Sequence, residues 1–358
     1  MLGIRDEAYT PRHMKKYSDR FGIYNKVGGM VCAFSSNAID WEENRVHGLY
    51  YNIETCEWEY GIFPLPSVIY RRDFHQSQEV IEGLKKATKG KIFNTHRFSK
   101  LELFETLEEH CKLAKKLPTT AMLKSFEQLK EFVAMHKKAI LKPNNLSRGR
   151  GICIVEKKGE GYVVSDYRVK QHFDIVLKDD CEFCQFYEDN TEFQDDYLIQ
   201  KHINLAKVAG CAFDTRIVMQ KDSRGRWGLS GMECRVADPK SLITNISRGG
   251  YAIEIEKALQ IAFNDEKEVK PLVKRIYEYC LGICKCLDGT GEHYMELGLD
   301  IGIDVDKNIW LFEANVLPSF KGFKQMDYNT YLKIRYKPLL YALSLTEFAE
   351  GKFGLCGF

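Results

Sequence analysis

Long hydrophobic runs and an excess of one charge are both missing from this sequence. No stretch approaches the roughly 20 apolar residues of a membrane span, and the first residues lack the apolar core of a signal peptide. We therefore expect a cytoplasmic protein without a membrane partner. The 52 basic and 50 acidic side chains nearly cancel, so nothing predicts nucleic acid as a partner. Repeats are also missing, and 44% hydrophobic residues are typical of a globular protein.

A second CxxC motif is missing too. The 12 cysteines include a single CxxC pair, Cys181 and Cys184, whereas a four-cysteine zinc site needs two such pairs. In a protein without an export signal, cysteines are typically reduced and packed as small apolar residues. We therefore expect structural thiols, and the sequence leaves open whether any of them binds metal.

Both common phosphate-binding motifs are missing, but a glycine-containing loop joins two expected strands. It runs from Leu141 to Gly151, reads LKPNNLSRGRG, and leads into strands at 152–156 and 162–166. A Walker A loop or a dinucleotide fingerprint would have to open a helix instead. Backbone N–H groups of such a loop can close over phosphates, with Lys142 as a charge below them. An ordinary hairpin connection is the alternative.

Periodicity and punctuation predict the remaining elements. Short β-rich runs in the first 95 residues lie at 29–34, 46–51, 57–63 and 67–70. Helices are predicted from Ser99 to about Lys115, from Ser125 onward, and over 266–287. These patterns indicate a mixed α and β protein with more than one subdomain.

The segment 294–315 predicts a β-hairpin that carries oxygen ligands. With a turn at 306–307, counting back places Asp300 opposite Glu313, and Asn315 lies on the same face. Paired carboxylates are unfavourable unless a cation or proton intervenes, and these oxygen donors suit Mg²⁺. A solvated acidic face is the alternative. The other face is predicted to pack in the core and consists of Leu299, Ile301, Ile303, Trp310, Phe312 and Ala314.

Two polar pairs precede this hairpin. Asp214 and Arg216 alternate in a predicted strand at 212–220, so they share one face. Asn245 and Arg248 lie in a tract that ends in two glycines, which allow the backbone to approach a ligand closely. Polar residues of an edge strand and an unliganded loop are the respective alternatives.

In this order, the segments resemble the ATP-grasp superfamily over roughly 93–323. Details such as the run NTHRFSK at 94–100 are most similar to the endospore coat-associated, YheC/YheD-like branch. The resemblance implies an α+β ATP-grasp fold, in which two α+β subdomains clasp ATP. A small N-terminal domain, rich in β-strands, precedes them in the sequence. The implied boundaries are an N-terminal domain at 1–95, an ATP-grasp domain at 96–325 with its lid at about 120–200, and a C-terminal helix at 326–358.

The resemblance also implies roles for individual residues. Those that would hold ATP are Lys100, Lys142, Ser147, Gly149, Gly151, Gln200, Lys201, Ile203 and Asp214. Those that would bind one or two Mg²⁺ ions, with Mn²⁺ as the alternative, are Asp300, Glu313 and Asn315. The catalytic positions would be Arg216, Asn245 and Arg248. Gln200 stands where many relatives have an acidic residue, and Ile243 where the glutamate ligases carry an arginine, so their substrates are not carried over.

The activity that the resemblance implies is an ADP-forming ligase. A carboxylate attacks the γ-phosphate of ATP to give an acylphosphate, and an amine from an amino acid or peptide then displaces phosphate. Charge neutralisation and exclusion of water suffice for this chemistry, so no Cys, Ser or His nucleophile is expected. A structural component of the spore coat that binds nucleotide or has lost turnover, and a kinase, are the alternatives. The substrates and the oligomeric state are left open, and deposition in the spore coat is an alternative to the cytoplasm.

Overall fold

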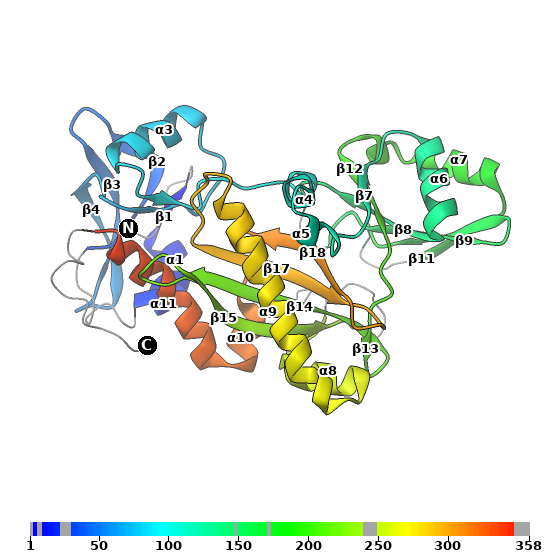
Figure 1. The fold of residues 1–358 in the computed structure, drawn as a ribbon. Helices are drawn as coiled ribbons and strands as arrows, with labels where there is room; N and C mark the ends of the chain where they lie inside the picture. Colours follow the sequence, from blue (N-terminus) through cyan, green and yellow to red (C-terminus); the bar gives the residue numbers. More distant parts are fainter. Residues whose placement is uncertain are drawn as a thin grey trace.

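The computed structural model describes residues 3–5, 9–21, 30–146, 149–169, 173–238 and 249–346. Figure 1 shows three groups of elements: an N-terminal sheet at the left, a central sheet, and a separate sheet with two helices at the right. In the described ranges, no helix combines the length and the apolar composition that a membrane span needs. The α+β class predicted from the sequence is therefore confirmed.

The N-terminal sheet has the order β1-β2-β3-β4. Its strands are β1 (Gly3–Arg5), β2 (Cys32–Asp40), β3 (Arg45–Asn52) and β4 (Glu57–Pro64). Around it lie α1 (Pro11–Met14), η1 (Lys15–Phe21) and α3 (Gln78–Ala87), and a separate parallel pair is formed by β5 (Ile69–Tyr70) and β6 (Ile92–Phe93). All four predicted β-rich runs therefore contain strand residues, although the last forms only a two-residue strand.

The sheet at the right of Figure 1, which we call the lid, has the order β11-β10-β9-β8-β12-β7 and is antiparallel. Its strands are β7 (Thr120–Met122), β8 (Lys138–Pro143), β9 (Cys153–Lys158), β10 (Gly161–Asp166), β11 (Phe173–Leu177) and β12 (Tyr197–Lys201). One face packs against α6 (Phe126–His136) and α7 (Asp180–Asp189), with η2 (Thr191–Gln194) before β12. Ser125 caps α6, as predicted, by accepting a hydrogen bond from the backbone of Gln128 at 3.2 Å.

The central sheet has the order β16-β15-β14-β17-β18, with the short β13 beside β14. Its strands are β13 (Lys207–Val208), β14 (Cys211–Lys221), β15 (Trp227–Val236), β16 (Tyr251–Ile253), β17 (Glu296–Ile303) and β18 (Ile309–Asn315). One face forms the largest core with α8 (Ile255–Phe263) and α9 (Glu266–Asp288). The end of the other face packs against α10 (Lys321–Met326) and α11 (Tyr328–Ser344), and its remainder faces a cavity.

The helix predicted from Ser99 divides into α4 (Lys100–Glu108) and α5 (Cys111–Ala114). Its predicted start is confirmed by a capping box, in which the Ser99 hydroxyl accepts from the Glu102 backbone and the Glu102 carboxylate accepts from the Ser99 backbone. Because this cap fixes where α4 begins, it also fixes the position of Lys100 in the first turn of the helix.

The β17–β18 hairpin pairs Asp300 with Glu313, as predicted, through a different turn. The loop has three residues and ends with Lys307 at a positive φ of 63°. The extra loop residue shifts the register by one residue from the predicted one. A β-bulge at Phe312 shifts it by one residue in the opposite sense, and this restores the predicted pairing of Asp300 with Glu313. The prediction that Trp310 and Phe312 pack in the core is wrong. The buried apolar residues of β18 are instead Ile309, Leu311 and Ala314.

Candidate functional site

A cavity of about 880 Å³ lies between the lid and the open face of the central sheet. Its walls come from the start of α4, from β8 and the loop that follows it, from β12, from the central strands and from the start of α10. The residues that the sequence predicted for a site and that line this cavity are Lys100, Lys142, Gly149, Gln200, Ile203, Asp214, Arg216, Asp300, Glu313 and Asn315. Segments as far apart in the sequence as Lys100 and Asn315 therefore meet in one place, and the functional roles of these residues stay predictions.

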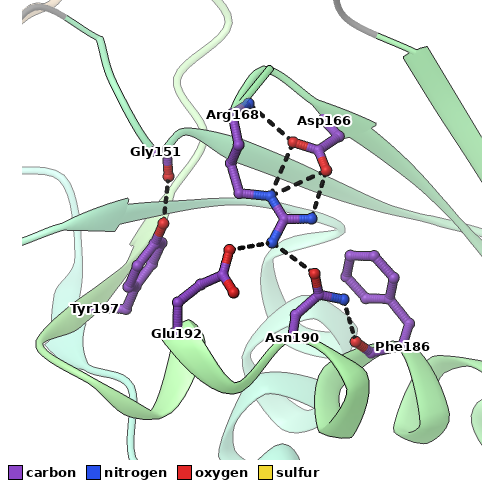
Figure 2. Close-up of polar contacts among 7 residues, drawn as sticks. All are labelled: Gly151, Asp166, Arg168, Phe186, Asn190, Glu192 and Tyr197. Carbon is purple, nitrogen blue, oxygen red and sulfur yellow. Dashed lines mark hydrogen bonds and ion pairs between the residues drawn. The ribbon is translucent and has the colours of Figure 1, made fainter.

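Five predicted site residues are not among those that line the cavity. Lys201 follows Gln200 in β12, and the alternation of the strand directs the two side chains to opposite faces. Gly151 ends the β8–β9 loop at a φ of 74°, where its carbonyl accepts a hydrogen bond from the Tyr197 hydroxyl at 2.9 Å (Figure 2). The remaining three lie outside the described residues and are Ser147, Asn245 and Arg248.

Two lysines lie with little access to solvent at the lid side of the cavity. Lys142 donates a 2.9 Å hydrogen bond to the Gln200 side chain, and burial together with the nearby Lys100 lowers its pKa to about 7. Lys100 donates to the carbonyls of Pro143 at 3.0 Å and Asn144 at 3.1 Å, and burial lowers its pKa as well. Because water solvates neither ammonium well, an anion such as a phosphate would relieve an existing cost.

The loop between β8 and β9 is fixed at both ends. Asn144 and Asn145 donate side-chain hydrogen bonds to the Asp196 carboxylate at 3.0 and 2.6 Å. Figure 2 shows the other end, where Arg168 binds Asp166, Asn190 and Glu192 beside the Tyr197–Gly151 contact. The loop is a hairpin connection in topology, and Gly149 and Arg150 line the cavity, so the two interpretations of the sequence are compatible.

Four charged residues form one row across the central sheet. Register pairs Glu233 of β15 with Arg216 of β14, Arg216 with Asp300 of β17, and Asp300 with Glu313 of β18. Neighbours in such a row share a face, which here is the cavity face. The row therefore consists of a carboxylate, a guanidinium and two adjacent carboxylates.

The two carboxylates at one end of the row differ in their partners. Asp300 accepts a forked pair of hydrogen bonds from Arg216 and lies 3.2 Å from Arg235. Burial opposes ionisation of Asp300, but the two arginines hold its pKa below the usual range. Burial and the neighbouring Asp300 raise the pKa of Glu313, which forms no ion pair with any described residue.

These residues fit a divalent cation through Glu313 and the Asn315 amide, with Asp300 beside them. A cation there would relieve the repulsion that raises the pKa of Glu313. Among the described residues, no group of three or more His, Cys, Asp and Glu side chains is arranged to hold a metal ion. A Mg²⁺ ion at this position would therefore need ligands from water and substrate phosphates, as is usual for Mg²⁺.

Sequence reasoning missed several charged residues that line the cavity, and two of them, Glu233 and Arg235, lie in β15. Arg235 donates to both oxygens of Asp214, at 2.7 and 2.5 Å, and thereby holds that carboxylate in place. Glu233 is only 2% exposed, and its Oε2 has no hydrogen-bond partner among the described residues. Burial raises its pKa to about 7 despite Arg216 and Arg235 nearby. The signal was the alternation along β15, which is the same pattern that identified Asp214 and Arg216.

Part of the lid-side wall of the cavity is apolar. Ile140 and Ile154 are paired neighbours in β8 and β9, and Tyr167 packs against Ile154. Phe312 lies against Gly302, where a Cβ would overlap its ring. A cavity that has both an apolar wall and charged groups suits a ligand that joins a planar base to phosphates.

Comparisons with known proteins show the family and the fold of this chain. The endospore coat-associated protein YheD of Bacillus subtilis (strain 168) is 27% identical over 334 residues, which are 89% of this chain and 72% of that protein. YheC of the same organism is 24% identical over 336 residues, which cover 91% and 89%. The ATP-grasp ligase PsnB, solved with precursor peptide PsnA2 and AMPPNP, superposes with a TM-score of 0.54 at 14% identity over 96% of this chain and 98% of that one, which shows a shared fold. The model of YheC/D-like ATP-grasp domains matches residues 89–345, and the chain therefore belongs to the YheC/D-like ATP-grasp family.

Proposed function

We propose that this protein is an ATP-dependent, ADP-forming ligase that joins a carboxylate to an amine through an acylphosphate. The observation that carries the proposal is one cavity that combines two poorly solvated lysines, a row of charged residues of both signs and an apolar part of the lid-side wall. Phosphoryl transfer requires little covalent participation of protein groups, so positioning and charge neutralisation are what the site must supply.

The residues divide this work along the cavity. The apolar wall at Ile140 and Ile154 receives the adenine, with Gln200 and Ile203 beside it, and Lys100 and Lys142 hold the phosphates. Mg²⁺, held by Asp300, Glu313 and Asn315, would neutralise charge on the phosphate oxygens. The family resemblance adds Ser147, Asn245 and Arg248 to the groups that hold ATP and the transferred phosphoryl group.

Arg216 lies in the middle of the row, where the transferred phosphoryl group and the acyl group would meet. Its guanidinium is held by Asp300, so it does not need to reorganise when negative charge develops. The glycine-containing loop over the cavity would keep water from the acylphosphate. Reaction would release ADP and phosphate together with an amide.

The substrates we propose are an amino acid or peptide amine and a carboxylate of the same class. PsnB was solved with a precursor peptide, which shows that this fold accommodates peptides in another protein. The coat-associated relatives suggest the cytoplasm of a spore-forming cell as the site of action, with deposition in the coat as the alternative.

Thermal unfolding with a non-hydrolysable ATP analogue, in Mg²⁺ and in EDTA, tests nucleotide binding. A ligand at 100 times its dissociation constant stabilises a protein by about 2.7 kcal/mol. We expect a Mg²⁺-dependent shift that disappears in Lys142→Met and persists in the control Lys158→Met, because Lys158 is an exposed lysine of the same sheet. A chain that shows no shift under any of these conditions contradicts the proposal. ADP release with carboxylate and amine pairs would then identify the substrates.

A further inference from the structure

Glu233 lies at the end of the charged row opposite to Glu313. Three strand spacings separate the two positions, so their backbones are about 14 Å apart. Arg216 and Asp300 lie between them, and the strand register pairs Glu233 directly with Arg216, which is not among the residues proposed to bind Mg²⁺. The nucleotide phosphates and Mg²⁺ belong at the Glu313 end, so Glu233 faces the region beyond the transferred group.

The carboxylate of Glu233 is buried, and none of the described residues donates a hydrogen bond to its Oε2. Both oxygens pack against Gly322 at the start of α10, where a Cβ would overlap them. The two nearest arginines bond to other carboxylates, Arg216 to Asp300 and Arg235 to Asp214. A buried acceptor without a donor carries a desolvation cost in the described structure, and a ligand with N–H groups would remove that cost.

The order of charges along the row indicates which ligand this is. The carboxylates at Asp300 and Glu313 suit a metal cation, and Arg216 suits an anionic phosphoryl or carboxylate group. The next position, Glu233, is again negative and repels a carboxylate, so it suits a second cation. In a ligase that joins a carboxylate to an amine, that cation is the ammonium group of the amine.

We propose that Glu233 binds the ammonium group of the amine substrate and accepts a proton from it before the amine attacks the acylphosphate. This inference rests on the ligase function proposed above and names the residue that recognises the second substrate. Glu233 would then be a catalytic residue, because its carboxylate touches the reacting nitrogen.

The proton balance of this step is complete. The ammonium nitrogen gives one proton to the Glu233 carboxylate and attacks the acyl carbon as a neutral amine. The C–N bond forms, the bond between the acyl carbon and the phosphate oxygen breaks, and a second amine proton leaves with inorganic phosphate. Glu233 then loses its proton to solvent when the product leaves.

The electrostatic surroundings are consistent with that role. Burial raises the pKa of Glu233 to about 7, Arg216 and Arg235 oppose this rise, and Asp214 and Asp300 add to it. Lys321 of α10 lines the same cavity. When the pKa of a carboxylate base lies near the working pH, a substantial fraction of the base is ionised, and the ionised form binds a proton more strongly than an ordinary carboxylate does.

The test uses the full chain with ¹³C at the side-chain carboxyl of glutamate, together with a non-hydrolysable ATP analogue and Mg²⁺. Glu233→Gln removes one NMR signal and so assigns it, and Glu233→Asp removes the same label if the first variant does not fold. Methylammonium serves as the probe for the amine. Tetramethylammonium is the control, because it has the same charge and no N–H donor.

We expect the Glu233 signal to titrate near pH 7 and its midpoint to fall by about 1 unit or more with methylammonium, because N–H groups that hydrogen-bond to a carboxylate favour its charged form. Tetramethylammonium should leave the titration midpoint of Glu233 unchanged. Neither probe should change the midpoints of the other glutamates. If methylammonium does not change the titration midpoint of Glu233, or if both probes change it equally, the inference is overturned. Melting of the same sample reports nucleotide binding, so failure of the proposed function is seen separately.

Discussion

The two faces of the central sheet have opposite compositions although they belong to the same strands. Along β14, Phe213, Ile217 and Met219 lie in the core under α8 and α9, whereas Asp214 and Arg216 alternate with them and line the cavity. One face therefore supplies apolar burial, and the other holds charges that have been removed from water. Substitutions on the two faces should separate stability from ligand binding, because each face carries one of these properties.

The largest effect is expected on the core face from Phe213→Ala. Phe213 is completely buried, and truncation of a buried phenylalanine costs about 3–5 kcal/mol through lost burial and a cavity. Chemical denaturation should show this loss, while the nucleotide-dependent melting shift persists at a temperature where the variant is folded. Loss of the nucleotide shift in a folded variant would mean that the two faces are not independent.

A pH-dependent effect is expected on the cavity face from Lys142. Its pKa is about 7 in the folded chain, whereas an unfolded lysine has its ordinary value near 10.4. Between these values the unfolded chain binds more protons, so stability rises with pH, by up to about 1.4 kcal/mol per unit.

Comparison with Lys142→Met isolates this contribution, because the variant retains the apolar stem of the side chain and lacks the titrating group. Urea denaturation of both proteins between pH 7.5 and 9.5 should show the wild type gaining stability relative to the variant. Parallel curves would mean that Lys142 keeps its proton in the folded protein.

A smaller effect, confined to binding, is expected from Glu313→Gln. Burial and Asp300 raise the pKa of the Glu313 carboxyl group, which means that its negative charge is unfavourable in the folded chain. Because the change removes this charge, the free energy of unfolding should stay unchanged or rise. The affinity for the nucleotide in the presence of Mg²⁺ should fall by about 10- to 100-fold, which corresponds to the usual free energy of an interaction with a charged group.

Calorimetric titration of the nucleotide in Mg²⁺ and in EDTA measures this difference. Glu160→Gln is a suitable control, because Glu160 is an exposed carboxylate in the β9–β10 turn. A Glu313→Gln variant with unchanged Mg²⁺ dependence would exclude this carboxylate as a metal ligand.

The contrast between the faces was only partly readable in the sequence. Strict alternation identified Asp214 and Arg216, and it would have identified Glu233 and Arg235 had the same rule been applied to β15. Contacts between the lid and the central sheet were not readable, because they depend on how distant segments pack. That none of the described residues donates to Oε2 of Glu233 follows from such packing and not from a local pattern.

Counting residues from the turn gave the correct Asp300–Glu313 pair for an incomplete reason. The turn contains one residue more than the count assumed, and the bulge at Phe312 compensates for it. Bulges are defined by one unpaired residue, and hydrophobic periodicity does not reveal that residue because its side chain is still apolar.

Phe312→Ala, the smallest expected effect, tests this correction. On a core face the change would cost about 3–5 kcal/mol, but a half-buried ring on the cavity wall should cost under half of that, about 1–2 kcal/mol. Because the ring lines the cavity, nucleotide binding should weaken as well. Leu311→Ala is the matched control, since Leu311 precedes it in β18, is fully buried and belongs to the core. Denaturation should therefore show a larger loss of stability for Leu311→Ala than for Phe312→Ala, although leucine is the smaller side chain. The reverse order would indicate that Phe312 packs in the core after all.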